Sequence, residues 1–223
     1  MKQLTARQTV QRHILEALLL TFLTLLAPIM VYVDLNIFQH GVPEIGATEI
    51  TQELFALISA LLFTKLAYKL PQQRGFYTLV AGFFFCVVIR ELDQFFDLLW
   101  HGFWLIPAIL CAVVAIGYAV FRCQGSVLQP MANFTHTKAY PFLLIGLLIL
   151  LIFSRVFGSG SLFWMSIMGD AYVHGFKNAL QEGLELLGYS FIFYSACLNY
   201  VKNHPITEKT LQPMPGYVQS VHH

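Results

Sequence analysis

Six long apolar runs follow one another along this chain, and they constrain its fold more than any other feature. They cover residues 14–33, 49–68, 76–97, 103–121, 140–157 and 177–200. A helix of about 20 apolar residues is about 30 Å long, which matches the hydrocarbon core of a bilayer. Spanning β-strands would be shorter and would alternate apolar with polar residues. We therefore expect an all-α, polytopic integral membrane protein with six transmembrane helices, arranged as three hairpins.

The composition indicates that the lipid bilayer is the solvent of this chain. Of its 223 residues, 57% are hydrophobic and 11% are charged, against about 25% charged residues in a soluble domain. With a net charge of +1, the chain lacks the excess of basic residues that nucleic-acid-binding proteins carry, so we expect no nucleic-acid partner. The four cysteines show no metal-ligand spacing, and we predict no disulfide bond among them.

The lysines and arginines predict how the helices are oriented. Ten of the thirteen lie before the first run, after the last run, or around the connections that follow the second and fourth runs. The other three are Arg90, Arg155 and Lys177. Basic residues gather on the cytoplasmic side of membrane proteins. We therefore expect both termini in the cytoplasm, one transmembrane domain over residues 1–202, and a mobile polar cytoplasmic tail over residues 203–223. The expected location is the inner (plasma) membrane of a bacterium, as a multi-pass protein.

Four charged residues lie at the same predicted depth, each on a different apolar run. They are Glu53, Arg90, Arg155 and Glu185. Each is fourteen or fifteen residues from the cytoplasmic end of its run, which is about 21–22 Å along a helix. Charged side chains at membrane depth are costly, so they are expected to face inward and to pair. Such a layer suits a clamp between helices as well as a binding site.

Further polar residues continue this layer toward the outer surface. After Ile89, the residues Arg90, Asp93, Asp97 and His101 fall within one arc of about 80° if the helix continues. The last apolar run also begins with a polar face. The candidate binding residues are therefore Glu53, Arg90, Asp93, Asp97, Arg155, Lys177, Glu182 and Glu185.

A repeated dipeptide suggests an alternative site. The pair His-Gly occurs at His40, His101 and His174, each time shortly before a helix that returns toward the cytoplasm. Three histidines with an open position for water are common ligands of catalytic zinc. These histidines are therefore candidate metal ligands and zinc a candidate cofactor, with Asp97 or Glu182 as general base. The repeat also fits three hairpins of similar construction, in which glycine helps the chain to turn.

The same residue types resemble those of the alkaline ceramidase and adiponectin-receptor superfamily of intramembrane hydrolases. The matching positions are Ser59, Asp97, His101 and His174. The chain departs from that superfamily by having six predicted helices in place of seven, and its last helix lacks the paired histidines. The resemblance implies a metal-dependent hydrolase that acts on a lipid.

Three functions fit these observations. The first, which we favour, is an outward-facing charged site that binds, senses or moves a small polar or ionic species or a lipid headgroup. Arg90 and Arg155 suit a carboxylate or phosphate, because guanidinium groups pair well with both. The second is the metal-dependent intramembrane hydrolase. The third is a structural subunit of a membrane complex, whose charges dock a partner protein.

Overall fold

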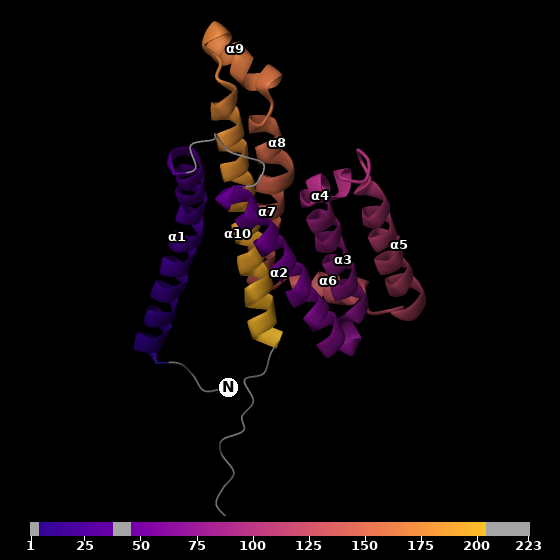
Figure 1. Cartoon of the computed structure of the whole chain (residues 1–223). Helices are drawn as coiled ribbons and strands as arrows, with labels where there is room; N and C mark the ends of the chain where they lie inside the picture. Colours follow the sequence, from indigo (N-terminus) through magenta and orange to yellow (C-terminus); the bar gives the residue numbers. More distant parts are fainter. Residues whose placement is uncertain (1–4, 38–45, 204–223) are drawn as a thin grey trace, which may run out of the picture.

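A computed structural model describes residues 5–37 and 46–203 of the chain, and Figure 1 shows their arrangement. Every regular element in these two ranges is a helix, and five helical segments are long and apolar enough to cross a membrane. The five are α1 (Ala6–Asn36), α2 (Ala47–Lys69), the turn η1 (Pro71–Gln73) with α3 (Arg74–Glu91), α5 (Leu105–Arg122), and the segment that joins α7 (Ala139–Leu148), η2 (Ile149–Phe153) and α8 (Ser154–Phe157). The predicted all-helical class is confirmed, and these segments are compatible with a multi-pass membrane protein.

The last helix, α10 (His174–Asn203), is not among the five but lies at the centre of the bundle (Figure 1). It packs against α1, α2, α7, η2 and α8. Its buried side carries Glu185, Tyr189, Ile192 and Asn199. A helix that other helices surround can carry polar residues where a lipid-facing helix cannot. This position explains why α10, although 30 residues long, is less apolar than its neighbours.

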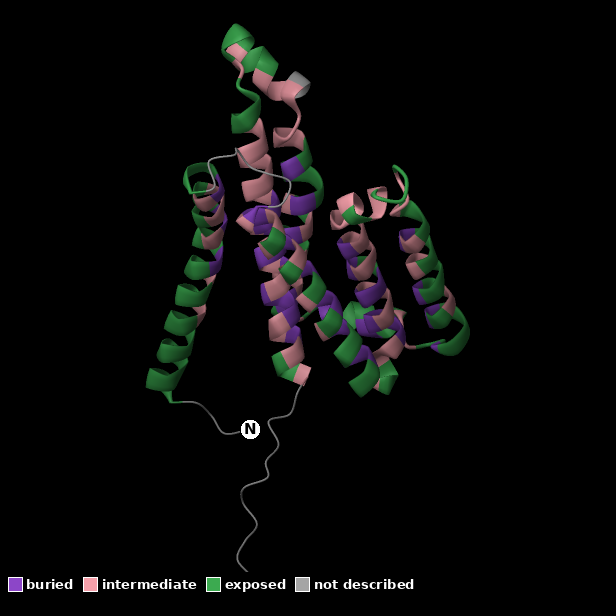
Figure 2. Ribbon diagram, in the orientation of Figure 1, coloured by how far each residue is buried: buried purple, intermediate pink, exposed green. Residues whose placement is uncertain are grey.

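Helix α1 is the most peripheral of the long helices, and Figure 2 shows most of it exposed. Its buried residues are Leu23, Ala27 and Asp34. The Asp34 carboxylate accepts hydrogen bonds from the backbone N–H groups of Ala47 (2.7 Å) and Thr48 (2.9 Å) and from the Thr48 hydroxyl (2.5 Å). A carboxylate is favourable at a helix N-terminus, where N–H groups have no partner within the helix. Asp34 therefore caps α2 from a neighbouring helix and connects α1 to the bundle.

The predicted helix over residues 76–97 is interrupted. Helix α3 ends at Glu91, and a short helix, α4 (Asp93–Asp97), follows. The Asp97 carboxylate accepts a hydrogen bond from the backbone N–H of Gly102 at 2.7 Å, and Gly102 has a φ of 84°. That backbone conformation favours glycine, and it turns the chain into α5. Arg90, Asp93, Asp97 and His101 therefore do not form one face of a continuous helix.

Four other segments complete the described chain. The helix α6 (Leu128–Thr135) lies within the polar connection 122–139, where no element was predicted. A segment beyond α8 projects from the bundle at the top of Figure 1 and contains η3 (Gly160–Trp164), α9 (Met165–Met168) and η4 (Gly169–Ala171). Residues 204–223 of the predicted tail lie outside the described residues.

Helices α3 and α5 approach each other closely at a pair of small residues. A Cβ atom built on Gly82 would lie closer to the Cβ of Ala115 than two such atoms normally come. Small residues allow this approach between membrane helices. The aromatic core of α2 and α3 lies beside it, where Phe63 stacks on Phe84 with ring centroids 5.8 Å apart.

We predict that Gly82→Leu destabilises the protein and that Gly117→Leu, on the same helix pair, does not. Overpacking a tight contact costs about 1–3 kcal/mol, whereas a Cβ built on Gly117 meets nothing within 4 Å. The measurement is the thermal unfolding temperature of the two variants in detergent. Equal changes in both variants would show that α3 and α5 do not pack at Gly82.

Candidate functional site

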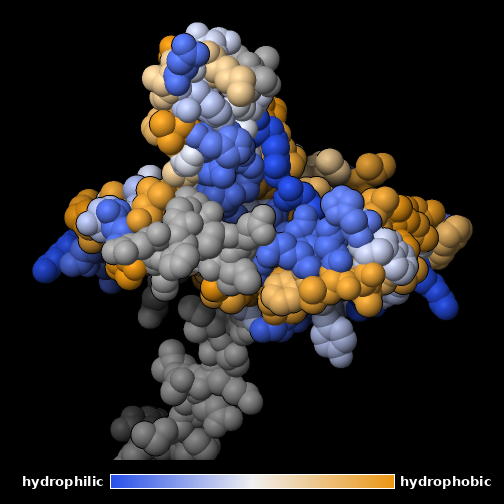
Figure 3. All heavy atoms as spheres, turned by 45° about the horizontal axis from the view of Figure 1, so that its top comes forward, coloured by the Kyte–Doolittle hydropathy of each residue, from blue (hydrophilic) through white to orange (hydrophobic). Residues whose placement is uncertain are grey.

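Polar side chains from four helices meet at the end of the bundle where α3 ends and α5 begins, the upper end in Figure 1. We call this group the polar cluster, and its members are Gln52, Arg90, Glu91, Arg155, Gln181, Glu182, Glu185 and Tyr189. Figure 3 turns this end toward the viewer and shows hydrophilic surface at the base of the projecting segment, with hydrophobic surface around it. The cluster thus lies at the end of the bundle from which the segment beyond α8 projects.

The first part of the cluster joins α3 to α10. The Arg90 guanidinium lies 2.8 Å from the Glu91 Oε1 atom, and the Tyr189 hydroxyl donates to the same oxygen at 2.7 Å. Tyr189 is only 1% exposed. A buried hydroxyl that donates to a carboxylate makes a strong, charge-assisted hydrogen bond. Glu91 is therefore held from both helices.

The second part joins α8 to α10. An Arg155 guanidinium nitrogen lies 3.4 Å from Oε1 of Glu185, and the Gln181 amide donates to the same oxygen at 3.1 Å. Arg155 follows η2, which is a π-helical turn. A π-turn holds one residue more than an α-turn, so it changes the direction in which the following side chains point. The structure thus pairs two of the four residues that were predicted to share one depth.

The third part joins α2 to α10. The Gln52 amide nitrogen donates to Oε2 and to the backbone carbonyl of Glu182, both at 3.0 Å. Gln52 is 2% exposed. Its neighbour Glu53 is half-buried, and its carboxylate repels that of Glu91. Glu53 is therefore near the cluster, although no guanidinium contact of Glu53 is found among the described residues.

Carboxylates outnumber guanidiniums in and around the cluster. The acids are Glu53, Glu91, Glu182 and Glu185, and the bases are Arg90 and Arg155. The Glu182 carboxylate is repelled by Glu185 and by Glu91. Negative charges that repel one another away from water are costly, and a bound cation or proton would remove the excess. Within the described part of the chain, no three His, Cys, Asp or Glu side chains converge closely enough to hold a metal ion.

The other predicted site residues lie apart from these contacts. Asp93 is in the first turn of α4, and Asp97 Oδ2 lies 2.8 Å from Nδ1 of His101. The His101 side chain is 99% exposed. A carboxylate in this position orients an imidazole ring. The His101 ring could therefore act as a general base or as a metal ligand.

The remaining candidate metal ligands form no common site among the residues that the structure describes. His174 Nδ1 lies 3.1 Å from the Tyr172 hydroxyl, in the connection before α10, and Lys177 is half-buried in the first turn of that helix. His40 lies outside the described residues. Ser59, from the hydrolase resemblance, is fully buried and donates to the Phe55 carbonyl at 2.7 Å. Its hydroxyl is thus engaged within α2.

The sequence contains a pattern that indicates that Gln52 faces inward, and a prediction from depth alone did not take it into account. The buried face of α2 consists mainly of small residues at helical spacing, among them Ala56, Ser59 and Ala60. Gln52 lies one turn before Ala56 on that face, whereas Glu53 is rotated by about 100° from it. Glu91 and Tyr189 had no comparable signal, because their meeting depends on how α3 and α10 pack.

Comparison with protein-family models gave no match, and comparisons with curated proteins and with solved structures gave none either. The functional argument therefore depends on the geometry of the cluster.

We predict that Tyr189→Phe lowers the free energy of unfolding by about 1–3 kcal/mol, because Glu91 loses a buried donor. Tyr68→Phe is the matched control, since Tyr68 is 83% exposed. Chemical denaturation in mixed micelles measures both. In the background of Glu91→Gln, the loss caused by Tyr189→Phe should become smaller, and an unchanged loss would show that the two side chains are not coupled.

Proposed function

We propose that α10 is a sixth membrane-spanning helix and that both ends of the described chain lie in the cytoplasm of a bacterium, at its inner membrane. At 30 residues, α10 is about 45 Å long. It packs against α2 and α7, and both α2 and the segment Ala139–Phe157 that begins with α7 are long and apolar enough to span. The helices α2, α5 and α10 each carry a basic residue in the last turn, namely Lys69, Arg122 and Lys202. Their common end is then the cytoplasmic one, and the polar cluster faces outward.

Reporter fusions test this topology. Fusions after Lys69 and after Asn203 should report the cytoplasm, and an insertion at Gly169 should report the outer side. The reason is that an even number of spans returns the chain to its starting side. A cytoplasmic signal at Gly169 together with an outer signal after Asn203 would show the opposite orientation of α10 and reject six spans.

We propose that the polar cluster binds protons from the outer side and that the protein senses the outer pH. The observation that carries this proposal is the excess of carboxylates over guanidiniums where four helices meet, with Glu185 buried and Glu53, Glu91 and Glu182 half-buried. Protons are the smallest species that can neutralise such an excess, and hydrogen-bonded carboxylates are the usual proton carriers within membranes. Because no described group of acids converges on a metal-sized site, a proton fits the cluster better than a metal ion.

Sensing is better supported than transport. Below the cluster, the centre of the bundle is filled by Phe63, Phe84 and Ile192, each at most 1% exposed. The buried polar groups near the cytoplasmic end, Tyr77 and Asn199, bond to each other at 3.2–3.4 Å. An apolar layer therefore separates the two polar regions, and a proton path would need a different packing of the helices. Proton uptake would instead weaken the contacts that carboxylates of α10 and α3 make with Arg155 and Arg90.

A second candidate function is the metal-dependent hydrolase, and the hydrogen bond between Asp97 and His101 favours it. Stoichiometric zinc in the purified protein that disappears in His101→Ala would support the hydrolase over the proton sensor. A protein that co-purifies through the charged end would support the structural-subunit alternative.

Infrared titration tests proton binding directly. We expect a protonated carboxyl band in the native protein near neutral pH, because the clustered acids do not all ionise together, and we expect the band to disappear as the pH rises. The band should be weaker in Glu182→Gln and unchanged in Glu16→Gln, whose carboxylate pairs with Arg12 and His13 on α1, away from the cluster. Identical bands in the two variants would show that the protons are bound elsewhere. If the native protein shows no protonated carboxyl band at any pH above the range in which free carboxylic acids titrate, the proposal is rejected.

A further inference from the structure

Two cysteines face each other between α3 and α5. The Cys86 thiol donates to the backbone carbonyl of Ala108 (3.3 Å), and the Cys111 thiol donates to that of Gly82 (3.8 Å). Ala108 lies one turn before Cys111, and Gly82 lies one turn before Cys86. The contacts are therefore reciprocal and place both sulfur atoms at one level, where they also interact with each other. Both thiols are free and half-buried.

The two helix backbones are close at this level. The contact of Gly82 with Ala115 lies one turn from each cysteine, and it leaves no room there for a larger side chain. A disulfide needs Cα atoms within about 7 Å of each other, and small residues at a helix contact allow such an approach. A bond between the two sulfur atoms thus requires side-chain rotation and little movement of the helices.

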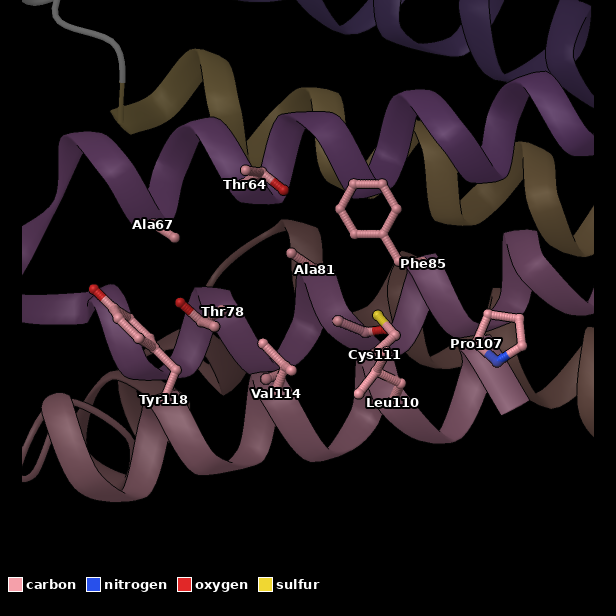
Figure 4. A pocket seen from close by; sticks show the side chains of 12 residues that line it. Thr64, Ala67, Thr78, Ala81, Phe85, Pro107, Leu110, Cys111, Val114 and Tyr118 are labelled. Carbon is pink, nitrogen blue, oxygen red and sulfur yellow. The ribbon is translucent and has the colours of Figure 1, made fainter. Parts of the chain in front are cut away.

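Cys111 also lines a groove of about 450 Å³ between α2, α3 and α5 (Figure 4). Its walls are almost entirely hydrocarbon, and hydroxyl groups are present at Thr64, Thr78 and Tyr118. The groove has the size and character of a site for a small apolar molecule. Leu110 and Val114, at its edge, are 62% and 61% exposed on helices apolar enough to span a membrane. The groove therefore opens toward the lipid.

We propose that Cys86 and Cys111 form a redox-active dithiol that a lipid-soluble quinone oxidises from this groove. Two S–H bonds break and one S–S bond forms. The two electrons and two protons pass to the quinone, which leaves as the quinol. The disulfide then joins α3 covalently to α5. This site is independent of the polar cluster and of the proposed proton sensing.

The surroundings of the thiols favour this class of oxidant. Dithiol, disulfide, quinone and quinol are all neutral, so none of them brings a charge into an apolar groove. Each thiol is held by a carbonyl acceptor as S–H, and a thiolate, which exchange with aqueous disulfides requires, is disfavoured among apolar side chains. A quinone accepts protons together with electrons, and it reaches the groove through the lipid. The hydroxyl groups of Thr78 and Tyr118 lie toward one end of the groove in Figure 4, away from Cys111. They can donate to a quinone oxygen while the ring approaches the sulfur.

The test uses the full-length protein in lipid nanodiscs and duroquinone, whose ring carbons are all substituted and cannot add a thiol. The variant Cys123→Ser, Cys197→Ser keeps only the proposed pair and is the reference, and its melting temperature should match that of the native protein. After duroquinone, denaturation and maleimide labelling, we expect both labels to be lost and one quinol to form per protein. Dithiothreitol should restore both labels, and the peptides of Cys86 and Cys111 should be linked and lighter by two hydrogen atoms.

Single substitutions and a second oxidant serve as controls, and they define the results that would overturn the proposal. In the same background, Cys86→Ser or Cys111→Ser should abolish quinol formation. Copper phenanthroline tests the geometry alone. A disulfide formed with copper phenanthroline but not with duroquinone would overturn the quinone chemistry, and the absence of a disulfide with both would overturn the pairing itself. Neither result bears on the infrared titration of the polar cluster, so the two proposals fail separately.

Discussion

A charged or hydrogen-bonding side chain that is removed from both water and headgroups must find its partner within the protein. In this structure that partner is repeatedly on α10. Gln52 bonds to Glu182, Arg155 to Glu185 and Tyr189 to Glu91 near one end. Near the other end, the Ser195 hydroxyl bonds to the Ala139 carbonyl. The helices α2, α3, α7 and α8 are thereby held around one polar helix, and their own outer faces are left to be apolar.

This arrangement separates two kinds of helix contact. The contacts of α10 are specific, because its side chains bond to defined partners on the neighbouring helices. The contact of α3 with α5 depends on close approach of small residues, and only weak donors, the two thiols, point into it. The first kind responds to charge, since protonation of a carboxylate changes the ion pairs. The second responds to oxidation, since a disulfide would fix it. The last residues of α3 thus take part in the polar cluster, and the middle of the same helix lines the groove.

The sequence predicted the elements well and the partners only in part. The apolar runs 49–68 and 103–121 correspond to α2 and α5 within two residues at each end, because hydrocarbon length determines where a spanning helix begins and ends. The same rule failed at Glu91, because the backbone leaves the α-helical conformation at Leu92 (φ −84°, ψ 19°). The contact of Asp97 with Gly102 then turns the chain into α5. Counting along helices gave the depths of Arg155 and Glu185, which pair. Counting could not give the rotation of each helix about its axis. The sequence therefore did not predict that Arg90 would pair with Glu91, or that Gln52 would be the side chain of α2 that bonds to α10.

The π-helical turn η2, Ile149–Phe153, has a consequence for how this sequence can vary. Such a turn holds one residue more than an α-helix needs. Loss of any one residue within it would restore a regular helix, with the same hydrophobicity and nearly the same length. Everything beyond it would then be rotated by about 100°, and Arg155 would no longer lie opposite Glu185. The ion pair is therefore encoded by the number of residues in the helix as much as by their identity. In related chains, a one-residue gap at this place should accompany a change at position 155 or 185.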